Sequence, residues 1–409
     1  MAFDVAAVRA QFPALNRSTI GAAMPVFFDN PAGTQVPERV IEAVGDYYRS
    51  MNANSGGAFA TSERSDAMVQ TVRMKLAAFL NAPRPDEIVI GPNMTTLNFA
   101  LSRALAQRFK PGDELIVTRM DHDANVAPWL RVAEERGMVV RWIELRSADC
   151  TLDLDSLEAA LNEKTRLVAT VHASNAAGTI NPVQRIAEMA HAAGALYIVD
   201  AVQSAPHIPI DVQAIGCDFL LCSSYKFFGP HAGVLWGRYD LLADLPAYKV
   251  RPAKDRPPHR WETGTPAFEL IAGLGAAIDY LASLGGHAEV TRTAIEIGMA
   301  AIGRYERSLL DALMDCLRRI PDLCLYGITD PAQFDCRVPT VIFTIEGHTP
   351  RAVAAHLAQH GIYVWDGDYY AFEIMRALGH GEHGMVRVGL VHYNTPEEIE
   401  RLEHALRAL

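Results

Sequence analysis

The sequence predicts an α/β protein with two parts, a large domain built on a mainly parallel sheet and a smaller α+β domain. Short β-branched runs alternate with helical patterns in the first part, which is typical of a parallel sheet covered on both faces. A Pro-, Arg- and Lys-rich stretch at 250–266 then precedes long helical patterns and three further strand-like runs. We expect the large domain at 26–285, and the small domain at 1–25 together with 286–409.

Seven strand-like runs form the expected large sheet. In chain order they are EIVIG (87–91), ELIVT (114–118), VVRWIEL (139–145), RLVATVHAS (166–174), ALYIVDA (195–201), DFLLCSS (218–224) and AGVLWG (232–237). The patterns at 95–109 and 182–194 have the apolar periodicity of intervening helices. Only YKFFGPH joins the last two runs, which is too short for a helical crossover, so the final strand is expected to be antiparallel.

The second part follows the stretch at 250–266, which is expected to be a loop and either a linker or a functional segment. Its expected elements are helices at 270–284, 288–319, 350–360 and 396–408 and strands at 340–345, 361–367 and 385–391. The N-terminal stretch MAFDVAAVRAQFPAL has the pattern of an amphipathic helix and lacks the basic start and cleavage site of a signal peptide.

Composition bounds the class of protein. The 409 residues carry a net charge of -11 without a lysine- or arginine-rich run, which argues against a nucleic-acid or anionic-membrane partner. The sequence has no apolar run of the roughly 20 residues that span a bilayer. Its six cysteines form no CxxC pair, so we expect reduced thiols and a cytoplasmic location. His356 and His360 have helical spacing but no acidic third ligand nearby, so no metal site is expected.

Polar residues follow the carboxyl ends of the predicted strands, where ligands bind in parallel sheets. Thr95, in PNMTT, is expected to cap the helix that follows it, and free N–H groups at a helix start bind phosphate. The other residues at strand ends are His122, Asn175, Asp200, Gln203, Ser223 and Lys226.

This set of side chains matches the needs of pyridoxal 5'-phosphate. The aldehyde of this cofactor requires a lysine for a Schiff base, and its ring nitrogen requires a buried carboxylate that keeps it protonated. The phosphate takes backbone N–H groups and hydroxyls, the ring takes a flat stacking group, and the phenolic oxygen takes amide donors. The sequence therefore predicts a pyridoxal phosphate site at this edge of the sheet.

Four motifs in order carry a family resemblance. They are H-x-A-N at 122–125, D-x-x-Q-S at 200–204, S-x-x-K at 223–226 and G-T-P at 264–266. In this order and spacing they resemble the class V aminotransferase family, and within it the cysteine desulfurase and selenocysteine lyase branch. The resemblance runs from FFDNPAG (27–33) to HYNTPEEIERL (392–402). It implies the pyridoxal phosphate-dependent transferase fold of type I and a homodimer with shared active sites.

The resemblance also implies residue roles. Lys226 forms the Schiff base, Asp200 pairs with the ring nitrogen, and His122 stacks on the ring; these three are the expected catalytic residues. Expected cofactor contacts further include Met94, Thr95, Asn175, Gln203, Ser223, Tyr225 and, from the partner subunit of a dimer, Thr265. Arg387 is expected to bind the carboxylate of a small amino-acid substrate, with Asn30 and Tyr370 also at the substrate.

The sequence departs from the desulfurase pattern in three places. Tyr225 replaces a histidine before the lysine, Trp365 replaces an arginine, and Tyr370 falls at or beside the position of the nucleophilic cysteine. No cysteine follows Cys336. Only a thiolate attacks substrate sulfur, so the persulfide relay is expected to be missing. Tyr370 is expected to fill the pocket rather than to act as a catalyst.

Two classes of function stay open at this point. A pyridoxal phosphate enzyme acting on an amino acid is favoured, as a C–S or related Cβ lyase, with a transaminase and an epimerase as alternatives; all begin by weakening a bond at Cα. A non-catalytic binding protein is the alternative of a different class. The retention of Lys226, Asp200, His122 and Arg387 argues against it.

Overall fold

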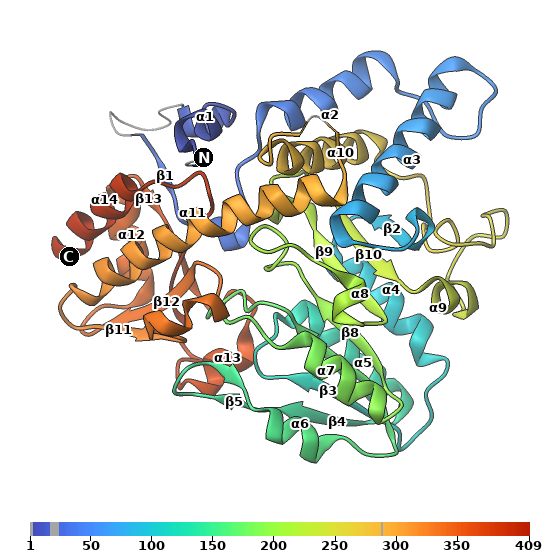
Figure 1. The fold of residues 1–409 in the computed structure, drawn as a ribbon. Coiled ribbons are helices and arrows are strands. Elements are labelled where there is room, and N and C mark those ends of the chain that lie inside the picture. The colour runs from blue at the N-terminus through green and yellow to red at the C-terminus, as the bar shows by residue number, and fades with distance from the viewer. Residues whose placement is uncertain (1–2, 17–23, 288) are drawn as a thin grey trace.

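The computed structural model describes residues 3–16, 24–287 and 289–409 (Figure 1). A seven-stranded sheet and a four-stranded sheet organise the described chain. Two small two-stranded sheets accompany them, β1 with β13 and β5 (Leu145–Arg146) with β6 (Thr151–Leu152). The two larger sheets correspond to the two expected parts.

The seven-stranded sheet has the order β2-β10-β9-β8-β7-β3-β4. Its strands are β2 (Ile88–Gly91), β3 (Glu114–Thr118), β4 (Val139–Ile143), β7 (Thr165–Val171), β8 (Leu196–Asp200), β9 (Phe219–Ser223) and β10 (Gly233–Gly237). The five strands from β9 to β4 are paired in parallel. Strand β10 is antiparallel to both β9 and β2, which confirms the expectation from its short connection.

Helices cover both faces of this sheet. Successive residues of a strand point to opposite faces, and Leu115 and Val117 accordingly belong to one buried cluster while Ile116 belongs to another. The helices of this part are α2 (Glu38–Ser50), α3 (Ala60–Leu80), α4 (Met94–Ala106), α5 (Ala127–Arg136), α6 (Leu154–Ala160), α7 (Val183–Ala192), α8 (Val212–Ile215), α9 (Tyr239–Asp244) and α10 (Phe268–Ser283). Helices α4, α7 and α10 confirm the expected ones.

The four-stranded sheet is antiparallel throughout. Its order is β11 (Leu323–Tyr326), β12 (Thr340–Ile345), β15 (Met385–Gly389), β14 (Trp365–Gly367). Helices α12 (Pro350–Gln359) and α14 (Pro396–Arg407) accompany it, and α13 (Phe372–Ala377) follows β14. The run expected as one strand at 361–367 is divided, because β13 (Ile362–Tyr363) pairs instead with β1 (Val26–Phe27).

Helix α11 (Arg292–Arg318) belongs to both parts and crosses the middle of Figure 1. Its first half supplies Ile295 and Met299 to the core under the large sheet. Its second half supplies Leu313 and Leu317 to the core of the small sheet. The N-terminal helix α1 (Val5–Arg9) contributes Val8 to the large core. The division at residues 25 and 285 stays a prediction.

Residues 250–266 form the expected loop of turns and bends. A buried ion pair ties this loop to the large domain: an Nη2 of Arg73 in α3 lies 2.6 Å from Oε2 of Glu262. Glu262 Oε1 also accepts a hydrogen bond from the N–H of Ile90 in β2, at 3.2 Å. The loop is therefore held at its second half, next to Thr265.

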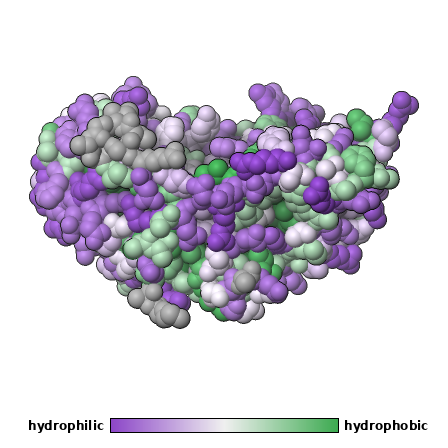
Figure 2. Space-filling model, turned by 90° about the horizontal axis from the view of Figure 1, so that it is seen from above, coloured by the Kyte–Doolittle hydropathy of each residue, from purple (hydrophilic) through white to green (hydrophobic). Residues whose placement is uncertain are grey.

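The face of the molecule in Figure 2 is mainly hydrophilic, with smaller hydrophobic areas between the polar side chains. Within the described ranges, every helix is too short or too polar to cross a bilayer. The same residues contain no group of three or more His, Cys, Asp or Glu side chains placed to bind a metal ion.

Candidate active site

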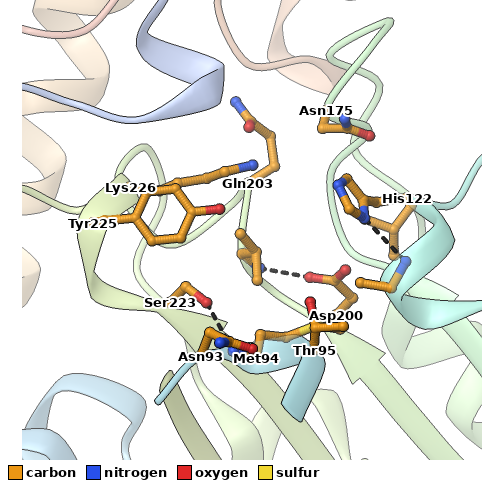
Figure 3. Close-up of a pocket in the computed structure, with 13 residues that line it drawn as sticks. Asn93, Met94, Thr95, His122, Asn175, Asp200, Gln203, Ser223, Tyr225 and Lys226 are labelled. Atoms are coloured by element: carbon orange, nitrogen blue, oxygen red, sulfur yellow. Dashed lines mark hydrogen bonds between the residues drawn. The ribbon is translucent and has the colours of Figure 1, made fainter. Parts of the chain in front are cut away.

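A cavity lies beyond the carboxyl ends of β7, β8 and β9 and contains about 430 Å³ of space free of protein atoms. Nine of the ten residues predicted to bind the cofactor line it, and Thr265 does not. The lining residues are Asn93, Met94, Thr95, His122, Ala124, Val171, Asn175, Asp200, Val202, Gln203, Ser223, Tyr225 and Lys226. Figure 3 shows these side chains arranged around one space. The roles expected of them stay predictions.

Lys226 and Asp200 are buried at this cavity, with 5% and 2% of their surface exposed. Burial lowers the pKa of Lys226, and the nearby charge of Arg387 lowers it further, while Asp200 opposes both effects. Burial raises the pKa of Asp200. A lysine of lowered pKa is a better nucleophile near neutral pH, and a buried carboxylate is stabilised by a cationic group placed next to it.

The start of α4 forms one side of the cavity. Asn93 is its N-cap and accepts from the N–H of Thr96 at 2.8 Å, so the expectation that Thr95 is the N-cap is wrong by two positions. The extended backbone of Asn93 and its side-chain oxygen make it the better cap. The N–H of Met94 donates to Ser223 Oγ at 3.1 Å, which leaves the Ser223 hydroxyl proton for a ligand. The N–H of Thr95 lies between these two bonds, at the positive end of the helix.

A glycine permits the close approach of α4 to the sheet. A Cβ atom on Gly233 in β10 would lie 2.3 Å from the carbonyl carbon of Asn93. Any other residue would push the helix start away from Ser223. The N-terminus of α4 and the end of β9 therefore meet at this corner because position 233 carries no side chain.

His122 presents a neutral imidazole to the cavity. Burial lowers its pKa to about 3, and the charges of Lys226 and Arg387 act in the same direction. Its Nδ1 accepts from the N–H of Ala124 at 3.0 Å, so the ring proton of the neutral form is on Nε2. A flat, uncharged ring at this position suits stacking on an aromatic cofactor.

Two buried amides have an oxygen that lacks a protein partner. Asn175 Oδ1 and Gln203 Oε1 accept no hydrogen bond from any side chain or backbone group that the structure describes. A buried polar atom without a partner costs free energy, about 1–3 kcal/mol for each group. These two amides, Ser223, the start of α4, Asp200 and Lys226 together offer the donors and acceptors that pyridoxal phosphate requires, so the residues fit that cofactor.

Tyr225 occupies the position before the lysine and also lines the cavity. Its ring stacks on His231 at 5.1 Å, and its carbonyl accepts from the N–H of Thr34 at 3.0 Å. Burial raises the pKa of Tyr225, and the Asp200 charge raises it further, so the phenol stays protonated and can donate a hydrogen bond.

Arg387 in β15 is buried and has an incomplete set of partners. Its Nη1 donates to the carbonyl of Asn175 at 2.8 Å, and its guanidinium lies 4.2 Å from the ring centre of Tyr369. Its Nε has no hydrogen-bond partner among the residues of the structure. Burial lowers its pKa to about 10, so the side chain is still charged at neutral pH. A buried cation with an unused donor fits an anionic ligand.

The expectation that Tyr370 fills the pocket is not met in this structure. Its side chain is 72% exposed, and its ring stacks on His122 at 5.5 Å from outside the cavity. Tyr369 and Tyr370 both have left-handed backbones, with φ values of 55° and 57°. Asn175 Nδ2 donates to the Tyr369 carbonyl at 3.0 Å, and the N–H of Asp123 donates to the Tyr370 carbonyl at 2.7 Å. These bonds hold a backbone that non-glycine residues rarely adopt.

Three other predicted site residues, Arg387, Asn30 and Thr265, are not among the residues that line the cavity. Asn30 Nδ2 donates to the carbonyls of Phe27 and Gly389, both at 2.8 Å, and its oxygen accepts from the Tyr393 hydroxyl. The hydrogen bonds of the Asn30 amide are thus made within the protein, because the chain from 27 to 33 packs against β15. Thr265 is exposed on the loop at 250–266 and does not line the cavity of its own chain.

All six cysteines are free, and the described residues that line the cavity include none of them. Burial raises the pKa of Cys222, the cysteine nearest in sequence to Lys226, and the Asp200 charge raises it further. Burial also raises the pKa of Cys150 and Cys316, each to about 12. These side chains are protonated thiols at neutral pH rather than nucleophilic thiolates.

Sequence reasoning missed three residues near the cavity. Asn93 is the helix cap, and the PN pair before the helix was a usable signal. Tyr369, not Tyr370, covers the Arg387 guanidinium. Asp121 is a second buried carboxylate, whose pKa burial raises to about 7, and the charge of Asp200 acts in the same direction. Its side chain accepts from Asn125 Nδ2 at 2.6 Å. The motif DHDAN offered Asp121 and Asp123 equally, and only the fold separates them.

Comparisons with known proteins give matches over nearly the whole chain. The family model described as Aminotransferase class-V matches residues 26–402. The chain is 37% identical to a protein of Synechocystis named "Probable cysteine desulfurase", over 98% of this chain and 95% of the relative. Among solved structures, a cysteine desulfurase from Thermococcus onnurineus is similar with a TM-score of 0.87 and 29% identity, over 98% of this chain and 97% of the other. The cysteine desulfurase CsdA from Escherichia coli gives a TM-score of 0.86 and 29% identity, over 100% and 98%.

Proposed function

Because the chain belongs to the class V aminotransferase family, we propose that this pyridoxal phosphate-dependent enzyme cleaves a C–S or related bond at Cβ of an amino acid without a persulfide relay. The family and its cysteine desulfurase relatives support the cofactor and the fold of type I. One observation carries the finer proposal: the loop beside the cavity carries Tyr369 and Tyr370, and none of the described lining residues is a thiol.

The residues that line the cavity have proposed roles in binding the cofactor. Ser223, the N–H of Thr95 and Tyr225 would hold the phosphate, and the partner's Thr265 would reach it in a dimer. Asp200 would keep the ring nitrogen protonated, His122 would stack on the ring, and Asn175 and Gln203 would contact the phenolic oxygen. When bound, pyridoxal phosphate supplies an electron sink for cleavage of bonds at Cα and Cβ.

The remaining residues act on the substrate. Arg387 would bind its carboxylate with the Nε donor that lacks a protein partner. Lys226, with its lowered pKa, would remove the proton at Cα, and the leaving sulfur would take up a proton as its bond to Cβ breaks. With cysteine as a test substrate, elimination and hydrolysis give pyruvate, ammonia and sulfide and consume one water. A relay would instead leave alanine and a sulfur atom on a protein thiol.

Product analysis tests the proposed reaction. The purified enzyme is incubated with cysteine, cystine and a panel of common amino acids, and keto acid, ammonia, sulfide and alanine are measured. We expect keto acid and ammonia in equal amounts, with no sulfur retained on the protein by mass spectrometry. Stoichiometric conversion of the cofactor to pyridoxamine phosphate, reversed by a keto acid, would support a transaminase instead, and racemised substrate would support an epimerase.

A matched control addresses the thiols. Cys324 and Cys336 are exposed, so replacing both with serine should leave the fold intact. We expect the double variant to keep its rate within about twofold, as is usual for surface substitutions away from a site. A protein persulfide on either residue, with alanine released, would reject the proposal.

We further propose a cytoplasmic homodimer with composite sites. Thr265 is exposed on a loop that the Arg73–Glu262 ion pair fixes in place, so the threonine is available to a second copy. Mixing Lys226→Ala with Thr265→Ala subunits should then restore activity above that of either variant, because one site of each mixed dimer has both native residues. A monomer with full cofactor affinity, or mixtures that only average the two variants, would contradict shared sites.

A further inference from the structure

A chain of buried polar side chains leaves the cavity at Gln203. The Gln203 Nε2 atom lies 3.5 Å from Nε2 of His207. The other ring nitrogen of His207, Nδ1, lies 2.8 Å from Oε2 of Glu306 in α11. Oε1 of Glu306 is 3.9 Å from Nδ1 of His392, whose Nε2 is 2.6 Å from the Tyr280 hydroxyl. The chain thus joins the cofactor cavity to the helix shared by both parts of the molecule.

Local backbone structure sets the first two members side by side. Residues 201–208 form helical turns, with the N–H of Ala205 bonded to the Ala201 carbonyl at 3.0 Å. Residues four apart lie on the same side of such turns, so Gln203 and His207 face the same way. The side chains of His207 and Glu306 are each 3% exposed. Buried ionisable groups persist when they pair, and these two do.

The number of protons on the His207–Glu306 pair decides what His207 offers to Gln203. With one proton, Nδ1–H donates to the Glu306 carboxylate and Nε2 is bare, so it can only accept. With two protons, one is on Nε2 of His207, and the other is either on Nδ1 of His207 or on Oε2 of Glu306. The two-proton pair is neutral overall, whereas the one-proton pair carries a buried negative charge.

The amide of Gln203 responds to this difference. In the structure its Nε2 faces His207 and also donates to Thr340 Oγ1 at 3.2 Å, and its Oε1 lacks a partner in the described chain. A bare Nε2 on His207 favours that orientation. An N–H on His207 would bond to Oε1 instead, and the Thr340 hydroxyl can donate to the same oxygen. The amide nitrogen would then turn toward the cavity, where the phenolic oxygen of the cofactor needs a donor.

We propose that His207, held by Glu306, is a positioning residue that sets whether Gln203 donates or accepts a hydrogen bond in the cofactor pocket. Burial raises the pKa of Glu306, which favours the neutral two-proton pair. His392 faces the pair from the segment after β15 and is itself neutral, since burial lowers its pKa to about 3. The other charged groups that border the cleft beside the pair are Arg307, Asp335 and Arg337. The inference depends on the family's cofactor and not on the reaction proposed above.

Nitrogen-15 NMR of histidine-labelled protein tests the proton directly. In spectra recorded with and without pyridoxal phosphate, the signals of His207 are assigned by their loss in His207→Gln. We expect a protonated Nε2 in the loaded protein. A bare Nε2 in the loaded protein would overturn the proposal, whatever reaction the enzyme catalyses.

A mutant cycle tests the coupling to Gln203. We expect His207→Leu to raise the pH midpoint of the visible band of the bound cofactor by about one unit, the size of one neutral hydrogen bond. The shift should vanish in a Gln203→Leu background, where no amide is left to orient. An equal shift in both backgrounds would show a general structural effect and reject the positioning role.

Two further variants complete the test. His207→Gln keeps an amide donor near the Nε2 position, so it should retain the wild-type pH midpoint of the cofactor band. This result can be read even if His207→Leu folds poorly. A midpoint shift in His207→Gln as large as the one expected for His207→Leu counts against the proposal. His172→Gln replaces another buried histidine, which follows β7 and makes no side-chain bond to Gln203 among the described contacts. It should leave the midpoint unchanged, and a matching shift there would make the effect nonspecific.

Discussion

We expect Lys226→Ala to lower the turnover of the amino-acid substrate by at least about 10²–10⁴-fold, the usual contribution of a positioned proton-transfer group. The side chain is the lysine that lines the cavity, and it lies among Asp200, His122 and Tyr225. Steady-state rates give the loss. Borohydride reduction followed by peptide mapping should place the cofactor on residue 226 in the wild-type protein and nowhere in the variant.

The matched control is Lys249→Ala. Lys249 lies outside the cavity, where its Nζ donates to the Ala253 carbonyl at 3.1 Å, and the variant should keep both activity and cofactor labelling.

The pH dependence of cofactor capture follows from the lowered pKa of Lys226, about 7, because only the neutral amine attacks an aldehyde. Capture of pyridoxal phosphate by cofactor-free protein should therefore accelerate as the pH rises through about 7. A label on another lysine would contradict the assignment.

Arg387→Ala should weaken amino-acid binding by about 2–5 kcal/mol, the range for removing one partner of a buried charge pair. The guanidinium is buried, its charge acts on both Lys226 and His122, and its Nε is free of protein partners in the described chain. Spectral titration of the loaded enzyme with amino acids measures the loss. The spectrum of the bound cofactor without substrate should not change.

Three comparisons separate carboxylate binding from a packing effect. Amines without a carboxylate should bind the wild-type enzyme and Arg387→Ala equally well. Arg387→Lys keeps a charge but not the planar fork, so it should recover only part of the affinity. Arg337 is a second buried arginine whose Nε likewise lacks a partner in the described chain. Both of its Nη groups, however, donate to carbonyls, those of Ile328, Ala177 and Thr340, so Arg337→Lys should not change the preference for carboxylates. Equal losses for acids and amines in Arg387→Ala would move the role to another residue.

The sequence was sufficient for the sheet and for most of the cavity, for a physical reason. Parallel strands bring their carboxyl ends to one edge, so Asp200 at the end of β8 and Lys226 after β9 had to lie close together. The short link before AGVLWG likewise allowed only an antiparallel β10, as observed. Both inferences depend on local patterns and on general rules of sheet topology.

The rest depended on contacts between distant segments. Asn30 suited a ligand as well as any amide, but Tyr393, 363 positions away, occupies its oxygen. Tyr370 turns outward because Asp123 holds its carbonyl, which no local pattern encodes. The N-cap of α4 was misplaced by two residues, a usual error at helix ends, where several polar side chains compete to be the cap.

Helix α11 has a consequence for cooperativity of unfolding. At 27 residues it is about 40 Å long, and its apolar face is divided between two cores. If one core unfolds while α11 stays in the other, the half of the helix that packed in the unfolded core exposes its apolar side chains to water. Partial unfolding of one part is thereby penalised, and the two parts are coupled into one cooperative unit. A chain cut before residue 286 would leave the large core without Ile295 and Met299, so this junction is a poor place to separate the protein into fragments that fold alone.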